Sequence, residues 1–152
     1  MIDNNPKVLF ICTGNYYRSR YAEIMFNHYT LANGLDWSAF SRGILASNRP
    51  WPISQHARKA LENASIPLIG AFRFPLQLSQ HDFEKASRIV VMYREEHYPL
   101  MQVHHPEWLN KVEFWHVPDI DVIEPKLALP MIEQGIAGLL DELMPSIQQY
   151  GT

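Results

Sequence analysis

The stretch Val8–Arg20, VLFICTGNYYRSR, indicates how this chain is organised. The short apolar run Lys7–Ile11 predicts a buried parallel strand. Apolar residues then recur at helical spacing, so we expect a helix that begins near Ser19 and ends at Gly34. The only cysteine of the chain, Cys12, is thus predicted at the end of a strand, a few residues before a helix.

Strand-like and helix-like segments alternate along the rest of the chain. Strands are predicted at residues 37–41, 88–93 and 111–115. Helices are predicted after Ser54 as an N-cap, after the S-x-x-D capping box at Ser79, and over about residues 94–103. A final helix carries an apolar stripe that includes Ala128, Met131, Ile132 and Ile136. This alternation favours one α/β domain over residues 1–152, with an open, mostly parallel sheet of about four strands and helices on both faces.

The turn after Cys12 has the composition of an anion site. Ligands of such sheets bind at the carboxyl ends of strands, and the N-terminus of a helix adds N–H groups and positive potential there. We expect Gly14 to supply a positive φ, Asn15 to tie the loop to itself, and Arg18 to hold two phosphate oxygens. The same field favours a nucleophilic thiolate at Cys12. The alternative is a buried, unreactive cysteine, which is the commoner role of a lone cysteine.

Composition narrows the classes of partner. The 152 residues carry a formal net charge of −3 without a basic run, so we expect neither nucleic acid nor a membrane as partner. No signal-like segment is found, and a cytoplasmic location is the expectation. One cysteine excludes an internal disulfide and a cysteine-based zinc site. The seven histidines lack the spacing of metal ligands and are predicted on the surface or in caps, so no metal or cofactor is expected.

The loop resembles that of the low-molecular-weight protein tyrosine phosphatases, a family that also includes some arsenate reductases. The family pattern is C-x-G-N-x-C-R-S followed by P-x-A-E, and its matching residues here are Cys12, Gly14, Asn15, Arg18, Ser19, Ala22 and Glu23. Ser41–Gly43 is similar to the family's S-x-G after the second strand, and residues 53–66 and 82–92 also resemble family segments. The resemblance covers nearly the whole chain. It implies a three-layer, doubly wound α/β fold with a four-stranded parallel sheet.

The resemblance also implies a role for each matching residue. Cys12 would attack phosphorus, and Ser19 would hydrogen-bond the thiolate and ease its departure from the phosphocysteine. Asp119 would act as the general acid, with Asp121 as the second choice. The predicted phosphate-binding residues are Thr13, Gly14, Asn15, Tyr16, Tyr17, Arg18 and Ser19.

Three positions depart from the family pattern. Tyr17 replaces the second loop cysteine, so Cys12 cannot be protected by an intramolecular disulfide. Arg20 stands where a proline is usual. Asp119 is followed by Ile120 rather than by the proline and tyrosines that wall an aromatic substrate.

The sequence and this resemblance therefore predict a metal-independent phosphomonoester phosphatase of the protein phosphotyrosine type that acts through a cysteinyl-phosphate intermediate. Tyr16, Tyr17 and Tyr93 are candidates for a substitute aromatic wall. The expected partner is a phosphorylated protein or small phosphomonoester, and the expected state is a monomer or weak homo-oligomer. Two alternatives stay open, an arsenate reductase that uses an external thiol and a non-catalytic phosphate-binding module.

Overall fold

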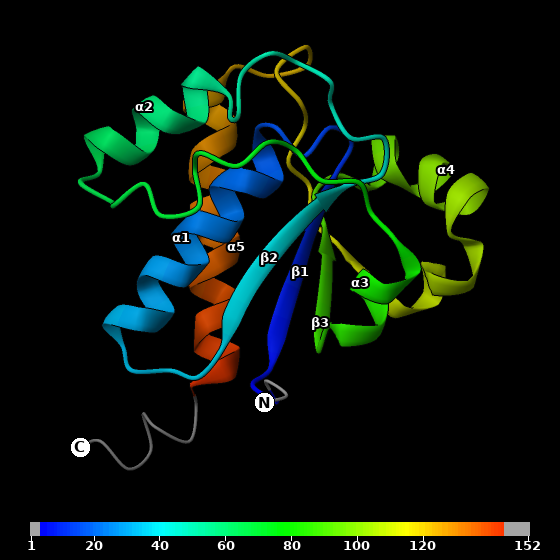
Figure 1. Cartoon of the computed structure of the whole chain (residues 1–152), viewed down its shortest axis with the longest axis horizontal. Coiled ribbons are helices and arrows are strands. Elements are labelled where there is room, and N and C mark those ends of the chain that lie inside the picture. Colours follow the sequence, from blue (N-terminus) through cyan, green and yellow to red (C-terminus); the bar gives the residue numbers. More distant parts are fainter. Residues whose placement is uncertain (1–3, 145–152) are drawn as a thin grey trace.

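A computed structural model describes residues 4–144, and a parallel sheet lies at its centre (Figure 1). Residues 1–3 and 145–152 of the predicted domain lie outside the described residues. The strand order is β2-β1-β3-β4, and each neighbouring pair is parallel. The strands are β1 (Lys7–Cys12), β2 (Ser38–Gly43), β3 (Arg88–Val91) and β4 (Glu113–Phe114).

Helices cover both faces of this sheet. Figure 1 shows three of them on one side, namely α1 (Arg18–Ala32), α2 (Gln55–Asn63) and α5 (Pro125–Leu143). On the other side lie α3 (Gln80–Lys85), α4 (Arg94–His104) and the 3₁₀ helix η1 (Pro106–Lys111). The predicted three-layer, doubly wound parallel sheet is confirmed. No helix among the described residues is long and apolar enough to cross a membrane.

The central strand β1 is buried on both faces. Its side chains alternate between two apolar clusters, with Val8 and Phe10 on the side of α1 and α5, and Leu9 and Ile11 on the side of α3 and α4. A strand without a polar face fits the unbroken apolar run that predicted it.

Helix starts follow the predicted capping residues. Ser54 Oγ accepts a hydrogen bond from His56 N at the start of α2. Ser79 and Asp82 form the capping box that opens α3. Met131, predicted on the apolar stripe of the last helix, is instead 38% exposed.

Strand ends were predicted less well than helix starts. β2 runs to Gly43 rather than Ser41, β3 stops at Val91, and β4 has only two residues, while η1 was not predicted. β4 is an edge strand that pairs with β3 alone, so only Val90 and Val91 set its length.

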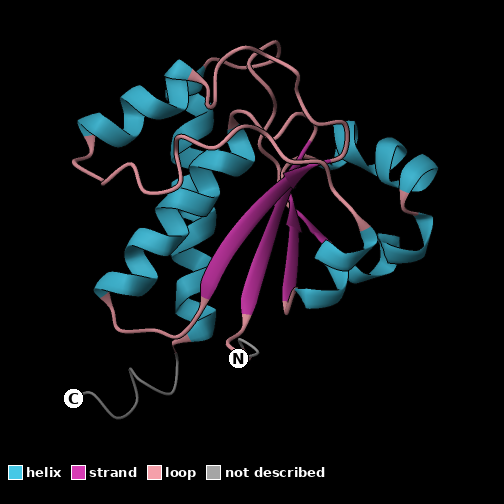
Figure 2. Cartoon of the chain, in the orientation of Figure 1, coloured by secondary structure: helices cyan, strands magenta, loops and turns pink. Residues whose placement is uncertain are grey.

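The loops that follow the strands gather at the carboxyl end of the sheet, at the top of Figure 2. The chain leaves β1 toward β2 on one side and returns to β3 on the other, so β1 and β3 flank the point where the strand order reverses. Cys12, the last residue of β1, lies at this point.

Candidate active site

Cys12 is buried, 3% exposed, at the base of the loop between β1 and α1. Its Sγ lies 2.9 Å from Ser19 Oγ in the first turn of α1 and accepts a hydrogen bond of 3.3 Å from Asn15 N. The predicted order of strand, cysteine, loop and helix is therefore the observed one. The hydroxyl and the amide both approach the sulfur from the helix side.

Hydrogen bonds to its backbone carbonyl groups hold the loop between Cys12 and Arg18 in place. Three of them accept hydrogen bonds from the segment after β2: Thr13 O from Leu45 N (2.9 Å), Gly14 O from Ser47 N (2.8 Å) and Tyr16 O from Ser54 N (2.9 Å). In a trans peptide the N–H points opposite to the C=O, so outward carbonyls turn the amides of the same peptides toward the loop centre. Asn15 N, which shares a peptide with Gly14 O, accordingly points at Cys12 Sγ. This backbone arrangement suits a bound oxyanion.

Asn15 and Gly43 shape the backbone of the loop. Asn15 takes the left-handed conformation, with φ 54°, whereas the positive φ expected at Gly14 is wrong. Asn15 can supply the turn because its side chain is fixed by hydrogen bonds, described below. Gly43, at the end of β2, matters for space: a Cβ there would lie 2.7 Å from Thr13 O and 2.9 Å from the carbonyl carbon of Gly14. The loop therefore packs directly against the backbone of Gly43, with no side chain between them.

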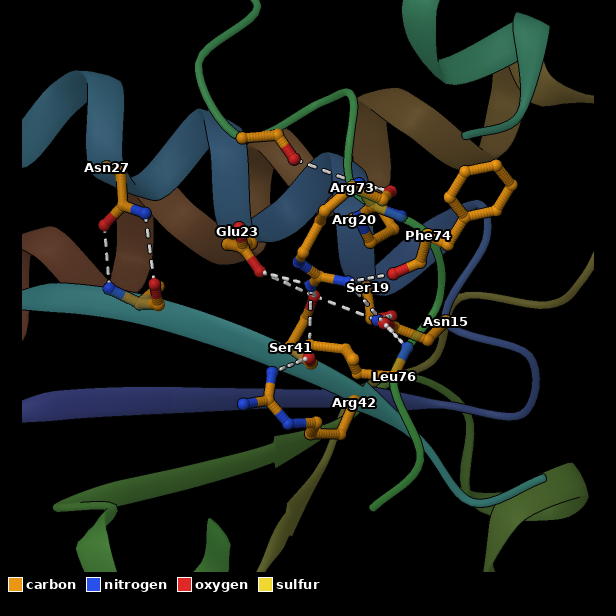
Figure 3. A network of polar contacts seen from close by, with 12 residues as sticks. Asn15, Ser19, Arg20, Glu23, Asn27, Ser41, Arg42, Arg73, Phe74 and Leu76 are labelled. Atoms are coloured by element: carbon orange, nitrogen blue, oxygen red, sulfur yellow. Dashed lines mark hydrogen bonds and ion pairs between the residues drawn. The ribbon is translucent and has the colours of Figure 1, made fainter. Parts of the chain in front are cut away.

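The side chain of Asn15 sets the direction of the hydrogen bond between Ser19 and Cys12 (Figure 3). Asn15 Oδ1 accepts from Arg73 Nη1 (3.0 Å) and Leu76 N (3.0 Å), which can only donate. Asn15 Nδ2 therefore donates to Ser19 Oγ (2.8 Å), which leaves the Ser19 proton for the sulfur. The Ser19 hydroxyl is therefore the donor and Cys12 Sγ the acceptor.

The same amide is anchored on its far side. Asn15 Nδ2 also donates to Ser41 Oγ (2.9 Å), and Ser41 Oγ donates to Glu23 Oε1 (2.7 Å). Arg73 Nη2 donates to both Glu23 Oε1 (3.0 Å) and Ser41 Oγ (3.0 Å). The family resemblance gave Ser41 and Glu23 only as positions that match its pattern. In the structure they support the loop through these hydrogen bonds. Arg73 was not predicted.

Arg18 lies in the first turn of α1 with its side chain only 2% exposed. Its Nη2 donates to Glu96 Oε2 (2.7 Å) and lies 3.5 Å from Asp119 Oδ2, while Nη1 donates to Val117 O (2.9 Å). Burial alone would lower the pKa of Arg18, but the charge of Cys12 and the hydrogen bond to Glu96 raise it above its ordinary value. The guanidinium is therefore a fixed cation beside the loop.

Glu96 and His97, at the start of α4, complete the support and were not predicted. Thr13 Oγ1 donates to Glu96 Oε2. His97 Nδ1 accepts from Tyr93 N (3.0 Å), so its proton is on Nε2, which lies 3.1 Å from Thr13 Oγ1 and 3.1 Å from Glu96 Oε2. His97 is fully buried, so the prediction of a surface position is wrong for this histidine, whose ring instead bonds the backbone of Tyr93, the N-cap residue of α4.

A cavity of about 370 Å³ opens above Cys12 and Arg18. Asp119 lines it with a side chain that is 38% exposed, whereas Asp121 is exposed and is not among the lining residues. Asp119 Oδ1 accepts from Ile120 N (2.8 Å), which leaves Oδ2 toward Arg18. Asp119, and not Asp121, is therefore the carboxylate that faces the cavity.

Aromatic side chains form part of the cavity wall. Tyr16 and Tyr17 line it, but Tyr93 does not, so only two of the three candidate tyrosines reach it. The Arg49 guanidinium lies 4.9 Å from the centre of the Tyr16 ring, at the rim. Tyr17 is 7% exposed, and its hydroxyl has no hydrogen-bond partner among the described residues. Burial, together with the charge of Asp119, raises the pKa of Tyr17 to about 12.

A comparison with protein-family models matches residues 7–145 to the low molecular weight phosphotyrosine protein phosphatase model. The chain belongs to this family. Members of this family are hydrolases, and membership therefore identifies the chain as an enzyme of the low-molecular-weight protein tyrosine phosphatase type. A comparison with curated protein sequences finds no significant match.

Solved structures of the family share the fold. A low molecular weight protein tyrosine phosphatase from T. tengcongensis is 27% identical, with a TM-score of 0.74, over 93% of this chain and 99% of that one. A low molecular weight phosphotyrosine phosphatase from Vibrio cholerae O395 is 26% identical, with a TM-score of 0.77, over 91% and 97%. An arginine phosphatase from Geobacillus stearothermophilus is 21% identical, with a TM-score of 0.76, over 95% and 97%, which shows a common fold.

The described residues contain no group of three or more histidine, cysteine, aspartate or glutamate side chains placed to hold a metal ion. The cavity is lined instead by the Cys12 thiol, the guanidinium groups of Arg18 and Arg49, the Asp119 carboxylate and the backbone of the loop. This set can bind a tetrahedral oxyanion, attack it and exchange a proton with it.

Proposed function

We propose that the chain hydrolyses phosphomonoesters through a cysteinyl-phosphate intermediate formed on Cys12. Cys12 is the nucleophile, Arg18 and the loop amides from Thr13 to Ser19 bind the phosphoryl oxygens, and Asp119 is the general acid and base. The observation that carries this proposal is the hydrogen bond of Ser19 to Cys12 Sγ, because it places a donor on the sulfur that serves as nucleophile in the first step and as leaving group in the second.

The first chemical step transfers the phosphoryl group to sulfur. The Cys12 thiolate attacks phosphorus, the bond to the leaving oxygen breaks, and Asp119 gives that oxygen its proton. Arg18 is 2% exposed and faces the loop from a rigid helix start, so it stabilises the equatorial oxygens without first losing a hydration shell.

The second step returns the enzyme to its starting state. Asp119, now ionised, takes a proton from water, the water oxygen attacks phosphorus, and the bond to sulfur breaks. Ser19 donates to the departing sulfur, and Asn15 keeps the Ser19 hydroxyl pointed that way. Inorganic phosphate then leaves the loop.

The cavity supports an aryl phosphate as substrate. Tyr16, Tyr17 and Ile120 provide aromatic and apolar wall in a cavity of about 370 Å³. Asp121 and Glu124 lie on the exposed surface of the loop that carries Asp119, and they would repel strongly acidic peptides. A cytoplasmic location and a monomeric or weakly associated state stay predictions from the sequence.

The test is hydrolysis of para-nitrophenyl phosphate between pH 5 and 7 with a chelator present, by the wild type, Cys12→Ser and Asp119→Asn. We expect turnover that is lost in Cys12→Ser and lowered about 10²–10⁴-fold in Asp119→Asn, the usual contribution of a general acid. The rates on phosphotyrosine peptides, phosphoserine peptides and phosphoarginine then rank the substrate classes. Phosphoarginine is included because an arginine phosphatase has the same fold. Phosphate binding without turnover would contradict the proposal and favour the arsenate reductase or binding-module alternative.

A further inference from the structure

Arg20 is a buried cation that the proposed chemistry does not use. It lies in the first turn of α1, one residue after Ser19, and its relative exposure is 0%. Its guanidinium donates to three backbone carbonyl groups from two distant segments: Nη1 to Pro52 O (2.8 Å), and Nη2 to Gly70 O (3.0 Å) and Arg73 O (2.9 Å). Figure 3 shows the contact between Arg20 and the Arg73 segment above α1.

This burial is costly, because the hydrogen-bond partners of the guanidinium among the described residues are neutral carbonyl groups. Among the described residues no carboxylate lies within ion-pair distance of Arg20, and its Nε has no hydrogen-bond acceptor. Burial lowers the pKa of Arg20 to about 10, and the nearby charge of Arg73 lowers it as well, against the attraction of Glu23 and Cys12. A buried arginine with this energetic cost needs a structural reason, and the reason lies in the two segments whose carbonyl groups it binds.

Both segments that Arg20 holds reach the active site. Pro52 belongs to the segment 44–54, whose backbone amides fix the loop carbonyls and whose side chains line the cavity at Leu45, Ser47, Arg49 and Ser54. The other segment carries Arg73, which fixes Asn15 Oδ1. Arg20 is thus the side chain that joins α1 to both segments at once.

We propose that Arg20 is a positioning residue that fastens the rim segment 44–54 and the segment 70–73 against the start of α1, in place of the proline that is usual there. It does not touch the substrate. Segment 44–54 fixes the loop carbonyls and Arg73 fixes Asn15 Oδ1, so loosening the two segments also loosens the phosphate-binding loop. Loss of Arg20 therefore lowers kcat/KM. For this kinetic effect the proposal rests on the proposed function.

The test compares Arg20→Met with the wild type and with Arg88→Met. Methionine keeps much of the buried stem of Arg20 and removes all of its donors. Arg88 starts β3 at the opposite end of the sheet, where it pairs with Glu113 and Glu142. Arg88→Met is therefore the matched control: it also removes an arginine and its hydrogen bonds, but it does not touch the rim. Arg20→Lys is the conservative variant, which retains the charge and a donor for one or two of the three carbonyl groups.

Two readouts decide the proposal. Hydrogen exchange in Arg20→Met should be about tenfold faster or more in residues 44–54 and 68–76, with β1 unchanged, as expected for a local opening. The kcat/KM for para-nitrophenyl phosphate should fall about tenfold in Arg20→Met, whereas Arg88→Met changes neither kcat/KM nor rim exchange. Arg20→Lys should fall between Arg20→Met and the wild type in both.

Rim exchange in Arg20→Met equal to that of the wild type, or faster exchange spread evenly over the chain as in a general loss of stability, would overturn the proposal. If Arg20→Met does not fold, unaltered rim exchange and kcat/KM in Arg20→Lys would overturn it. The exchange experiment needs no turnover, so failure of the proposed function leaves this test intact.

Discussion

Replacing Glu96 by glutamine tests the hidden support of the loop. One carboxylate oxygen of Glu96 accepts from Arg18, Thr13 and His97, and the side chain is 27% exposed. Burial raises the pKa of Glu96, but the hydrogen bonds from His97, Arg18 and Thr13 outweigh burial and hold it well below its ordinary value. The ionised form is therefore more favourable in the folded protein than in the unfolded chain.

The structure sets the size of the effect. A hydrogen bond to a charged group contributes about 1.5–3 kcal/mol, and because Glu96 is partly exposed we expect Glu96→Gln to lose about 2 kcal/mol at pH 7. For a chain of this length each kcal/mol lowers Tm by roughly 2–4 °C, so Tm should fall by roughly 4–8 °C.

The pH dependence has a definite sign. Since the folded pKa of Glu96 is depressed, its stabilisation is fully present above the unfolded pKa of about 4.3 and is lost as the pH falls below it. The difference in free energy of unfolding between wild type and Glu96→Gln should therefore shrink below about pH 4.3.

Urea titrations at several pH values between 3.5 and 7 measure this difference. Glu84→Gln is the matched control, because Glu84 is exposed on α3 and accepts one bond from Gln80. It should change the free energy of unfolding by less than about 0.5 kcal/mol. A Glu96→Gln variant as stable as the wild type at pH 7, or a difference that persists unchanged at pH 3.5, would refute the reasoning.

Three further variants test single features of the site. Tyr17→Phe removes a buried hydroxyl without a partner, so thermal unfolding should show a gain of about 1 kcal/mol, and a loss would mean that the hydroxyl is satisfied in solution. Gly43→Ala forces a Cβ against Thr13 O, so phosphate affinity measured by calorimetry should fall at least about tenfold, and unchanged affinity would show that the loop can shift. Ser19→Ala removes the donor to the departing sulfur, so stopped-flow hydrolysis should show a burst followed by turnover slowed about 10²-fold, and the absence of a burst would show that Ser19 has no special role in the second step.

The chain order could be predicted because β1 and α1 are each set by local pattern. Five consecutive buried residues in β1 and the switch to helical spacing after it needed no knowledge of distant segments. The family motif then supplied Cys12, Arg18 and Ser19, and the structure brings these three together.

The supporting residues could not be predicted, because their roles depend on contacts across the fold. Glu96 lies 78 positions from Arg18 and 83 from Thr13, and Arg73 lies 58 positions from Asn15. In the sequence Glu96 is one of two adjacent acids on a predicted helix. The departure at Arg20 was visible in the motif, but only the fold shows that its guanidinium replaces a rigid ring by three hydrogen bonds.

The central claim is a covalent phosphoryl group on Cys12. Wild type, Asp119→Asn and Cys12→Ser are mixed with para-nitrophenyl phosphate, quenched in acid within milliseconds, and analysed by peptide mass spectrometry. We predict one phosphoryl group on the Cys12 peptide of the wild type, more of it in Asp119→Asn because the second step lacks its base, and none in Cys12→Ser. Turnover in Cys12→Ser, or hydrolysis by the wild type with no phosphoryl group on Cys12, would contradict the account.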